Sequence, residues 1–350
     1  SAKDGAGQPI LDLLPNFSMS ELALMIFILP IAISWWANWY PGAEPGGGSY
    51  IAQRMLAART ERDAMAGTLF FNVAHYALRS WPWIIVALAS LLVYPQLSDI
   101  AVSFPHVDPK LIGHDMAYPA MLKFLPVGWL GLMVAGLLAA YVSTLSTHLN
   151  WGTSYLVHDL YRRFMRTDAT ERHYVMVGRI VTALLMLAAG GLTFVLDSAR
   201  ESFQLLLSIG AGTGLLYLLR WFWWRINAWS EISAMICSFL LAAGFLVAQK
   251  SGTPVDPTVQ LLLSVGITTL VWVSVTLLTA PTERSTLLTF FRLVRPAGPG
   301  WRAVQAEAGV PASPDSLPMA FLGWVLGCTA VYSALFGTGS LLYGRTTQGL

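Results

Sequence analysis

The stretch GLMVAGLLAAYVSTLSTHLNWGTSYLVHDLYRRF, residues 131–164, decides the fold class. Its first charged residue is Asp159, so the run before it contains no acidic residue, lysine or arginine. About 20 mostly apolar residues are enough for a helix to cross a bilayer. The stretch therefore predicts a membrane-spanning helix over 127–157 that ends in a polar exit.

The composition of the whole chain agrees with a membrane protein. Only 11% of its 350 residues are charged and 55% are hydrophobic, whereas a soluble domain carries roughly 25% charged residues. The net charge of +2 gives no indication of nucleic-acid binding. Cys237 and Cys328 lie in apolar runs without metal-ligand spacing, so neither a metal site nor a disulfide framework is predicted.

Eight apolar stretches are long enough to span, and the fold class is an all-α integral membrane protein. The predicted spans are 21–40, 68–94, 127–157, 174–196, 202–224, 230–249, 258–280 and 318–343.

Basic residues distinguish the two sides of the membrane. The connections after the first, third, fifth and seventh spans, together with Arg179 and Arg220 in the adjoining span ends, hold fourteen of the 21 lysines and arginines. Cytoplasmic connections are enriched in Lys and Arg, so both termini are predicted outside the cytoplasm. The chain begins Ser-Ala-Lys-Asp without a signal-peptide pattern. An N-terminus outside the cytoplasm without a signal peptide predicts that further spanning helices precede it. The sequence would then be a processed chain or a fragment of a longer protein.

Two cytoplasmic connections, 49–66 and 285–295, are amphipathic. Each is either a helix lying on the membrane surface or a simple connector.

A predicted helix break follows the first span. Residues 40–49 contain two prolines and four glycines, which cannot continue a helix. This pattern is typical of the discontinuous helices that bind solute in transporters, although a surface loop is the alternative. The aromatic and amide residues before the break form either a substrate-contacting group or an interfacial belt: Trp35, Trp36, Asn38, Trp39 and Tyr40.

The span 68–94 carries Asn72, His75 and Arg79 on one helical face. An arginine within a bilayer costs at least ~2.5 kcal/mol, so it faces the bundle interior and is paired. One explanation is that this face contacts the substrate. The alternative is that Arg79 is structural, either paired with a carboxylate of a neighbouring helix or extended to the membrane interface.

The span 127–157 carries small and hydroxyl residues at positions i, i+3, i+4 and i+7, namely Ala140, Ser143, Thr144 and Thr147. Hydroxyl and carbonyl oxygens suit a small hard cation such as Na⁺, but small residues also line helix contacts in membranes. The spacing of these residues alone favours the explanation that they pack against a neighbouring helix.

The span 202–224 contains Gln204 and glycines that loosen a helix or permit close packing, and its aromatic and basic end, 220–225, is an interfacial anchor. The sequence has neither GxxxxGK[ST] nor HExxH, so an ATP-driven pump is not supported.

Three motifs resemble the sodium/solute symporter family, in order over about 100 residues. The first is the alanine-rich helix quoted above, with its Ser-Thr pair, Asn150 and the exit Asp159-Leu160-Tyr161. The second is Tyr50-x-x-Gln53-Arg54-x-Leu56-Ala57-Ala58-Arg59, and the third is Ala117-Tyr118-Pro119 with Leu125-Pro126-x-Gly128.

The resemblance implies a LeuT-type inverted-repeat fold, of which this chain is the second half. It implies an extracytoplasmic segment at 1–20, second-repeat core helices at 21–224 with the break at 40–49, and peripheral helices at 225–350. The family's first five core helices and its leading helix are absent from the sequence, so the missing N-terminal helices of the same protein become expected partners.

The resemblance also implies residue roles. Expected sodium ligands are Ala140, Ser143 and Thr144, with Ser146 and Thr147 where some members hold a second sodium ion. The expected substrate-binding residues are Asn38, Trp39, Tyr40, Asn72, His75, Arg79 and Gln204. The break is longer than usual for the family, and Glu44 within it is unexpected.

The predicted function is sodium-coupled symport of a small polar solute such as a sugar, an amino acid or a carboxylate, by alternating access. Na⁺ is the coupling ion, there is no other cofactor, and the location is a bacterial inner membrane. A transporter-like sensor or structural module is the alternative. A membrane enzyme would need clustered intramembrane carboxylates or histidines, which His75 and His148 do not provide.

Overall fold

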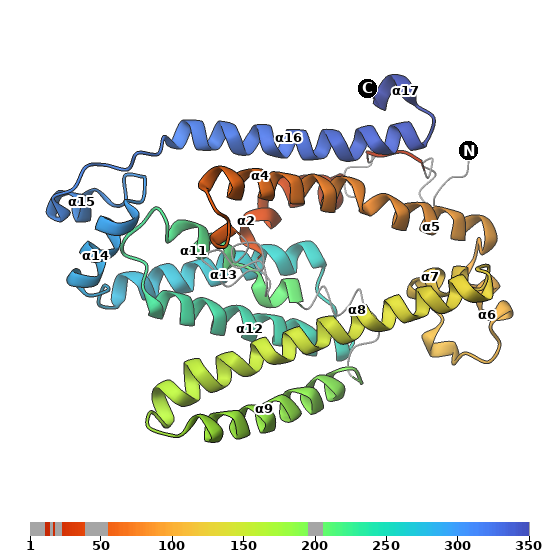
Figure 1. Cartoon of the computed structure of the whole chain (residues 1–350), viewed down its shortest axis with the longest axis horizontal. Helices are drawn as coiled ribbons and strands as arrows, with labels where there is room; N and C mark the ends of the chain where they lie inside the picture. Colours follow the sequence, from red (N-terminus) through yellow and green to blue (C-terminus); the bar gives the residue numbers. More distant parts are fainter. Residues whose placement is uncertain (1–10, 15–16, 18–22, 39–54, 195–205, 350) are drawn as a thin grey trace. The chain divides into compact units, whose positions relative to one another are not determined.

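The computed structural model describes residues 11–14, 17, 23–38, 55–194 and 206–349. Within these ranges the chain consists of helices and turns, with two isolated bridges and no strand (Figure 1). The all-helical prediction is therefore confirmed for the described residues.

Six helices in the described part of the chain are long and apolar enough to cross a membrane. They match six of the eight predicted spans, and the chain is an integral membrane protein. Their bounds are Glu61–Val93 (α4, Glu61–Asn72; a π-helical turn, Val73–Leu78; α5, Ser80–Val93), Val127–Met165 (α8, Val127–Ser154, and π-helical turns to Met165), α9 (Glu171–Leu192), α12 (Ala228–Lys250), α13 (Pro257–Leu278) and α16 (Leu317–Leu342).

Polar side chains fix where several of these helices begin. The hydroxyl of Thr60 accepts a hydrogen bond from the amide of Asp63 at 3.1 Å, and Asn227 and Ser230 form a reciprocal capping box at the start of α12. Asp256 accepts bonds from the first amides of α13, with Pro257 at the first helical position. These caps satisfy amide groups that have no partner within a helix.

The two remaining predicted spans run into residues outside the described ranges. The described part of 21–40 is helical from residue 23 to 37, ending in α2 (Trp35–Ala37). The described part of 202–224 is not one helix, which corrects the prediction. It is helical at 206–210, irregular at 211–213 and helical again in α11 (Gly214–Leu219).

The segment 49–66, expected to be either a surface helix or a connector, is not one continuous helix where it is described. Turns and bends occupy 57–60, and α4 begins at Glu61 because Thr60 caps it there. Residues 61–66 are thus part of the spanning helix. The second predicted amphipathic helix, 285–295, is confirmed as a helix, α14 (Arg284–Val294).

The chain divides into two compact units. Unit 1 comprises Ser1–Pro82 and Phe203–Leu350, and unit 2 comprises Trp83–Ser202. In unit 1, α12 and α13 lie side by side (Figure 1). Their contact contains a buried hydroxyl pair, in which Thr276 donates to Ser230 at 2.6 Å.

The last spanning helix is fixed to the first one in unit 1. The buried indole of Trp81 packs against Gly339 of α16 so closely that any side chain there would overlap it. Its N–H donates to the carbonyl of Leu335 at 3.2 Å, and Tyr343 meets it edge-on at 5.6 Å. The predicted peripheral helix 318–343 therefore packs directly on a predicted core helix.

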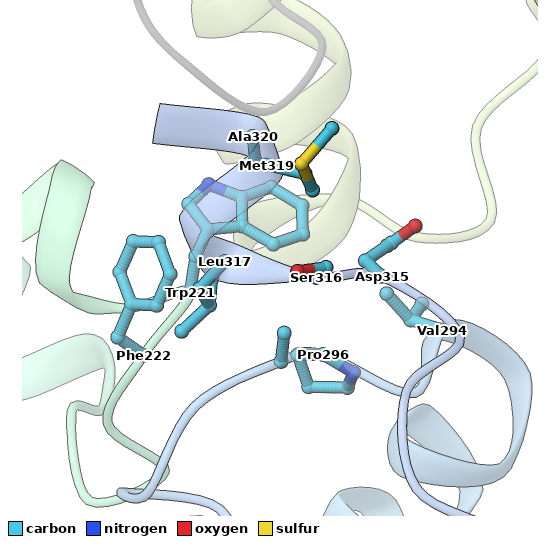
Figure 2. A pocket seen from close by; sticks show the side chains of 10 residues that line it. Trp221, Phe222, Val294, Pro296, Asp315, Ser316, Leu317, Met319 and Ala320 are labelled. Atoms are coloured by element: carbon cyan, nitrogen blue, oxygen red, sulfur yellow. The ribbon is translucent and has the colours of Figure 1, made fainter. Parts of the chain in front are cut away.

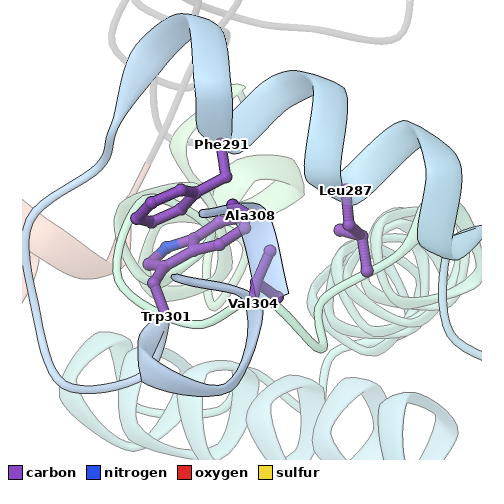
Figure 3. Packing of buried hydrophobic residues seen from close by; sticks show 5 residues of the cluster. All are labelled: Leu287, Phe291, Trp301, Val304 and Ala308. Atoms are coloured by element: carbon purple, nitrogen blue, oxygen red, sulfur yellow. The ribbon is translucent and has the colours of Figure 1, made fainter. Parts of the chain in front are cut away.

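The connection between α13 and α16 is a folded structure with its own core. Leu287 and Phe291 of α14 pack against Trp301 and against Val304 and Ala308 of α15 (Arg302–Ala308) (Figure 3). The indole N–H of Trp301 donates to the carbonyl of Trp221 at 2.9 Å. This helical hairpin is thus attached to the segment that follows α11.

In unit 2, α8 and α9 lie side by side (Figure 1). Thr153 and Thr182 share a hydrogen bond of 2.9 Å between these helices. Before α8, the chain folds over a small cluster formed by Tyr94, Ile100 of α6 (Leu97–Ser103) and Ala120 of α7 (Ala117–Leu122).

Candidate functional site

Two interruptions of helices meet in unit 1. The backbone leaves the helical conformation at Asn38, which is extended (φ −104°, ψ 124°) and forms an isolated antiparallel bridge with Ala211. The amide of Gly212 donates to the carbonyl of Ala37 at 2.9 Å. Ala37 and Ala211 are completely or almost completely buried. Non-helical backbone from two predicted spans is thus paired inside the protein.

Gly212 makes this crossing possible for two reasons. Its φ of +84° lies in the left-handed region, and a β-carbon would lie within 3.0 Å of the carbonyl oxygen of Ser264 and closer still to Thr268 on α13. Thr213 donates to the carbonyl of Gly210 at 2.7 Å. Ser238 of α12 donates to the carbonyl of Ile209 at 2.7 Å, which holds the chain before the break.

The side chain of Asn38 has an incomplete set of partners. Its carboxamide oxygen is buried and accepts no hydrogen bond within the described part of the chain. Buried polar groups in proteins are nearly always paired. The predicted residues next to it, Trp39 and Tyr40, lie outside the described residues, as do the break at 40–49 with Glu44, and Gln204.

On the first spanning helix, His75 and Arg79 are in contact, while Asn72 bonds to the preceding turn. A guanidinium nitrogen of Arg79 lies 3.4 Å from Nε2 of His75, and the ring of Phe71 stacks on His75 at 4.9 Å. A guanidinium carries donors only, so Nε2 is the acceptor in this contact. Asn72 donates to the carbonyl of Thr68 at 2.8 Å.

The helix is locally widened where His75 lies. Val73–Leu78 forms a π-helical turn, a feature that occurs often at functional sites. The carboxylate partner considered for Arg79 is not found among the described residues, where its hydrogen-bonding contact is His75. Arg79 is exposed in unit 1, and His75 and Asn72 are half-buried.

The small and hydroxyl residues of α8 form an exposed face. Within unit 2, α9 packs on a different part of α8, near Gly152 and Thr153. The predicted sodium ligands are all exposed, namely Ala140, Ser143, Thr144, Ser146 and Thr147. Both explanations of this stripe, helix packing and cation binding, stay predictions.

The oxygens along this face differ in their pairing. Thr147 donates to the carbonyl of Ser143 at 2.8 Å, and a ring nitrogen of His148 lies 2.8 Å from the carbonyl of Thr144. Hydroxyl groups facing an apolar environment gain from any partner that satisfies them. The face is chemically able to contribute part of the oxygen shell of a hard cation.

The crossing of Asn38 with Ala211 was missed by reasoning from the sequence. The run Gly210-Ala-Gly-Thr-Gly214 carried a signal, because several glycines in an apolar run permit both an interruption and close backbone approach. The described residues among those predicted lie on three elements: the end of the 23–37 helix, the 61–93 helix and α8.

Comparison with known proteins decides the family. The sodium:solute symporter family model matches residues 17–238, which is more than half of the chain and includes all three groups of predicted residues. The chain belongs to the sodium:solute symporter family. This is a family of membrane transporters and not of enzymes, and the resemblance read from the motifs is confirmed.

Several cotransporters are similar to the chain. The sodium/glucose cotransporter of Vibrio parahaemolyticus is 29% identical over 59% of this chain and 39% of its own length. The human sodium/myo-inositol cotransporter 2 is 27% identical over 77% of this chain and 43% of its own length. The chain thus matches less than half the length of these relatives.

Proposed function

We propose that this chain forms part of a sodium-coupled symporter that moves a small polar organic solute by alternating access. The observation that carries the proposal is the stripe of small and hydroxyl residues on α8, within the region that matches the symporter family. Hydroxyl and carbonyl oxygens at this spacing on one helical face can contribute to the shell of a hard cation.

The α8 stripe supplies one half of a sodium site in this proposal. Ala140 contributes its backbone carbonyl, and Ser143 and Thr144 contribute oxygens, while Ser146 and Thr147 are available to a second ion. The other half comes from helices of the same protein that precede this sequence in its relatives. Sodium binding favours the outward-open state, which then binds solute.

The solute-binding residues lie on the other two elements. Asn38, Trp39 and Tyr40 follow the helix that ends at the paired backbone, where the free carboxamide oxygen of Asn38 is an acceptor for a solute hydroxyl. Asn72, His75 and Arg79 offer further polar groups, and Gln204 is included on the family resemblance. The relatives are named for glucose and myo-inositol, so a polyhydroxylated solute is our first choice over an amino acid or a carboxylate.

The proposed architecture is the second half of a LeuT-type inverted repeat with about eight spans, located in a bacterial cytoplasmic membrane. Interrupted helices that pair near the centre of the fold are a feature of such transporters. The meeting of Ala37 with Gly212 at 2.9 Å supports this architecture.

The direct test is solute uptake by proteoliposomes that contain the whole native protein. Labelled glucose and myo-inositol are supplied with sodium outside, or with choline replacing it. We expect uptake to require sodium, and the double variant Ser143→Ala/Thr144→Ala to lower it at least tenfold. The matched control is Thr329→Ala, because Thr329 is an exposed threonine on α16 that bonds only to its own helix.

Uptake that continues unchanged without sodium, or in the double variant, would contradict the proposal. It would leave the transporter-like sensor or structural module as the better explanation.

A further inference from the structure

A cavity of about 580 Å³ lies in unit 1, and its lining includes none of the proposed solute or sodium residues. Three segments line it: the chain after α11, the chain after α14 and the start of α16. In Figure 2 the indole of Trp221 lies beside the first turn of α16, and Pro296 faces them across the opening. The lining residues are Trp221, Phe222, Val294, Pro296, Ala297, Asp315, Ser316, Leu317, Met319 and Ala320.

The walls of this cavity are held in place by the α14–α15 hairpin. Trp301 donates to the backbone of Trp221, which forms one wall. The chain turns at Arg295, which has a left-handed conformation (φ 47°, ψ 57°) between the lining residues Val294 and Pro296. Arg292 donates to the carbonyl of Ala308 at 3.1 Å. The cavity is therefore built from well-packed elements and lies within the size range of ligand sites.

The lining residues lie at the ends of helices, which places this cavity at a membrane surface. Leu317 is the first residue of a spanning helix, and Trp221 follows the helix that ends at Leu219. Tryptophan is enriched at the level of lipid headgroups. The connections that form the cavity hold Arg220, Arg225, Arg284, Arg292, Arg295 and Arg302, which is the pattern of a cytoplasmic side.

The chemistry of the lining combines apolar surface with one carboxylate. Leu317, Met319 and Phe222 suit hydrocarbon, while Asp315 is exposed at the rim and forms no ion pair within the described residues. A free carboxylate beside an indole attracts an ammonium group. It repels an anionic headgroup, and it cannot form hydrogen bonds with a quaternary ammonium because choline has no N–H.

We propose that this cavity binds a phosphatidylethanolamine molecule of the cytoplasmic leaflet. Its ammonium group donates to Asp315, and its acyl chains pack on Leu317, Met319 and Phe222. The site is distinct from the transport function proposed above and does not depend on it.

Native mass spectrometry of the purified protein tests this site. Phosphatidylethanolamine, phosphatidylcholine and phosphatidylglycerol with identical acyl chains are titrated separately. We expect phosphatidylethanolamine to bind about tenfold more tightly than the other two, the difference expected for one charge-assisted contact. Asp315→Asn should reduce its affinity to the level of phosphatidylcholine, and Ala297→Trp should remove binding by filling the cavity.

The matched control is Asp168→Asn, which neutralises an exposed aspartate on a connection predicted to lie on the same side. It should leave all three affinities unchanged. Equal binding of the three lipids would overturn the proposal, and so would unchanged phosphatidylethanolamine affinity in Asp315→Asn or in Ala297→Trp. Circular dichroism of each variant establishes that it is folded.

Discussion

At the scale of single residues, the most informative feature is the unpaired side-chain oxygen of Asn38, where its backbone pairs with Ala211. Leaving a buried acceptor such as Asn38 Oδ1 without a partner costs about 1–3 kcal/mol. Proteins retain such a cost where a ligand supplies the missing partner, which agrees with a solute-binding role for Asn38.

Residue types and spacing predicted part of this picture. His75 and Arg79 of the predicted polar face are in contact. The roles assigned to these residues and to Ser143 and Thr144 stay predictions. No pattern in the sequence shows that Asn38 pairs with Ala211, because 172 residues of chain separate them.

The first prediction concerns Gly212. Gly212→Ala adds a β-carbon against Thr268 and Ser264 and places an L-residue at φ +84°. Left-handed strain of about 1–2 kcal/mol and overpacking of about 1–3 kcal/mol both act against the folded state. The variant should therefore melt several degrees lower in a thermal unfolding scan of the purified protein.

Gly266→Ala is the control for this substitution. Gly266 lies in α13, where the new methyl group would meet no neighbouring atom within 4 Å beyond the helix's own backbone, and alanine favours helix. A melting temperature equally lowered in both variants would show that the crossing is not tightly packed.

At the scale of elements, length and apolar composition were sufficient to locate six spanning helices, with ends that differ from the structure by up to eight residues. They were insufficient for 202–224, because a continuous apolar run does not reveal a left-handed glycine at its centre. The amphipathic pattern of 49–66 also did not reveal that Thr60 caps the start of α4 at Glu61. Tertiary contacts and helix caps thus determine helix ends and interruptions that hydrophobic periodicity does not reveal.

The second prediction concerns the α14–α15 hairpin. Arg284 donates to Glu307 at 2.7 Å, and this hydrogen bond holds the pKa of Glu307 below its ordinary value of 4.5. A carboxylate with a lowered pKa stabilises the folded state above its unfolded pKa, and this contribution is lost as the pH falls through the folded pKa.

The difference in melting temperature between the wild-type protein and Glu307→Gln measures this contribution. It should be positive and constant from pH 7 down to about pH 5, and should shrink towards zero as the pH falls below 4.5. Glu283→Gln is the control, since Glu283 precedes α14 and has no hydrogen bond from its carboxylate among the described contacts. A difference that does not change with pH would rule out the ion pair as its cause.

At the scale of the whole molecule, the arrangement of basic residues predicts which connections face the cytoplasm. The structure divides the chain into two compact units, and the family match extends over both, from residue 17 to 238. The motifs alone were sufficient to predict this membership, because an ordered series of short motifs is more specific than composition. The sides of the membrane stay a prediction.

The third prediction tests this orientation with single cysteines. Thr286→Cys on α14 should react with a membrane-impermeant maleimide only from the cytoplasmic side. Ser251→Cys, after α12, should react only from the opposite side. Both positions are exposed, and Cys237 and Cys328 are replaced by alanine in the background. Labelling of both positions from the same side would contradict the predicted topology.

The central claim, that sodium and solute move together, is tested most directly by measuring both fluxes in the same vesicles. Proteoliposomes with the whole native protein receive ²²Na⁺ and a labelled solute identified in the uptake screen. We predict that adding solute accelerates ²²Na⁺ entry in a fixed ratio, and that Ser143→Ala/Thr144→Ala lowers both fluxes together while Thr329→Ala changes neither. Solute entry at full rate with no accompanying ²²Na⁺ would contradict the account.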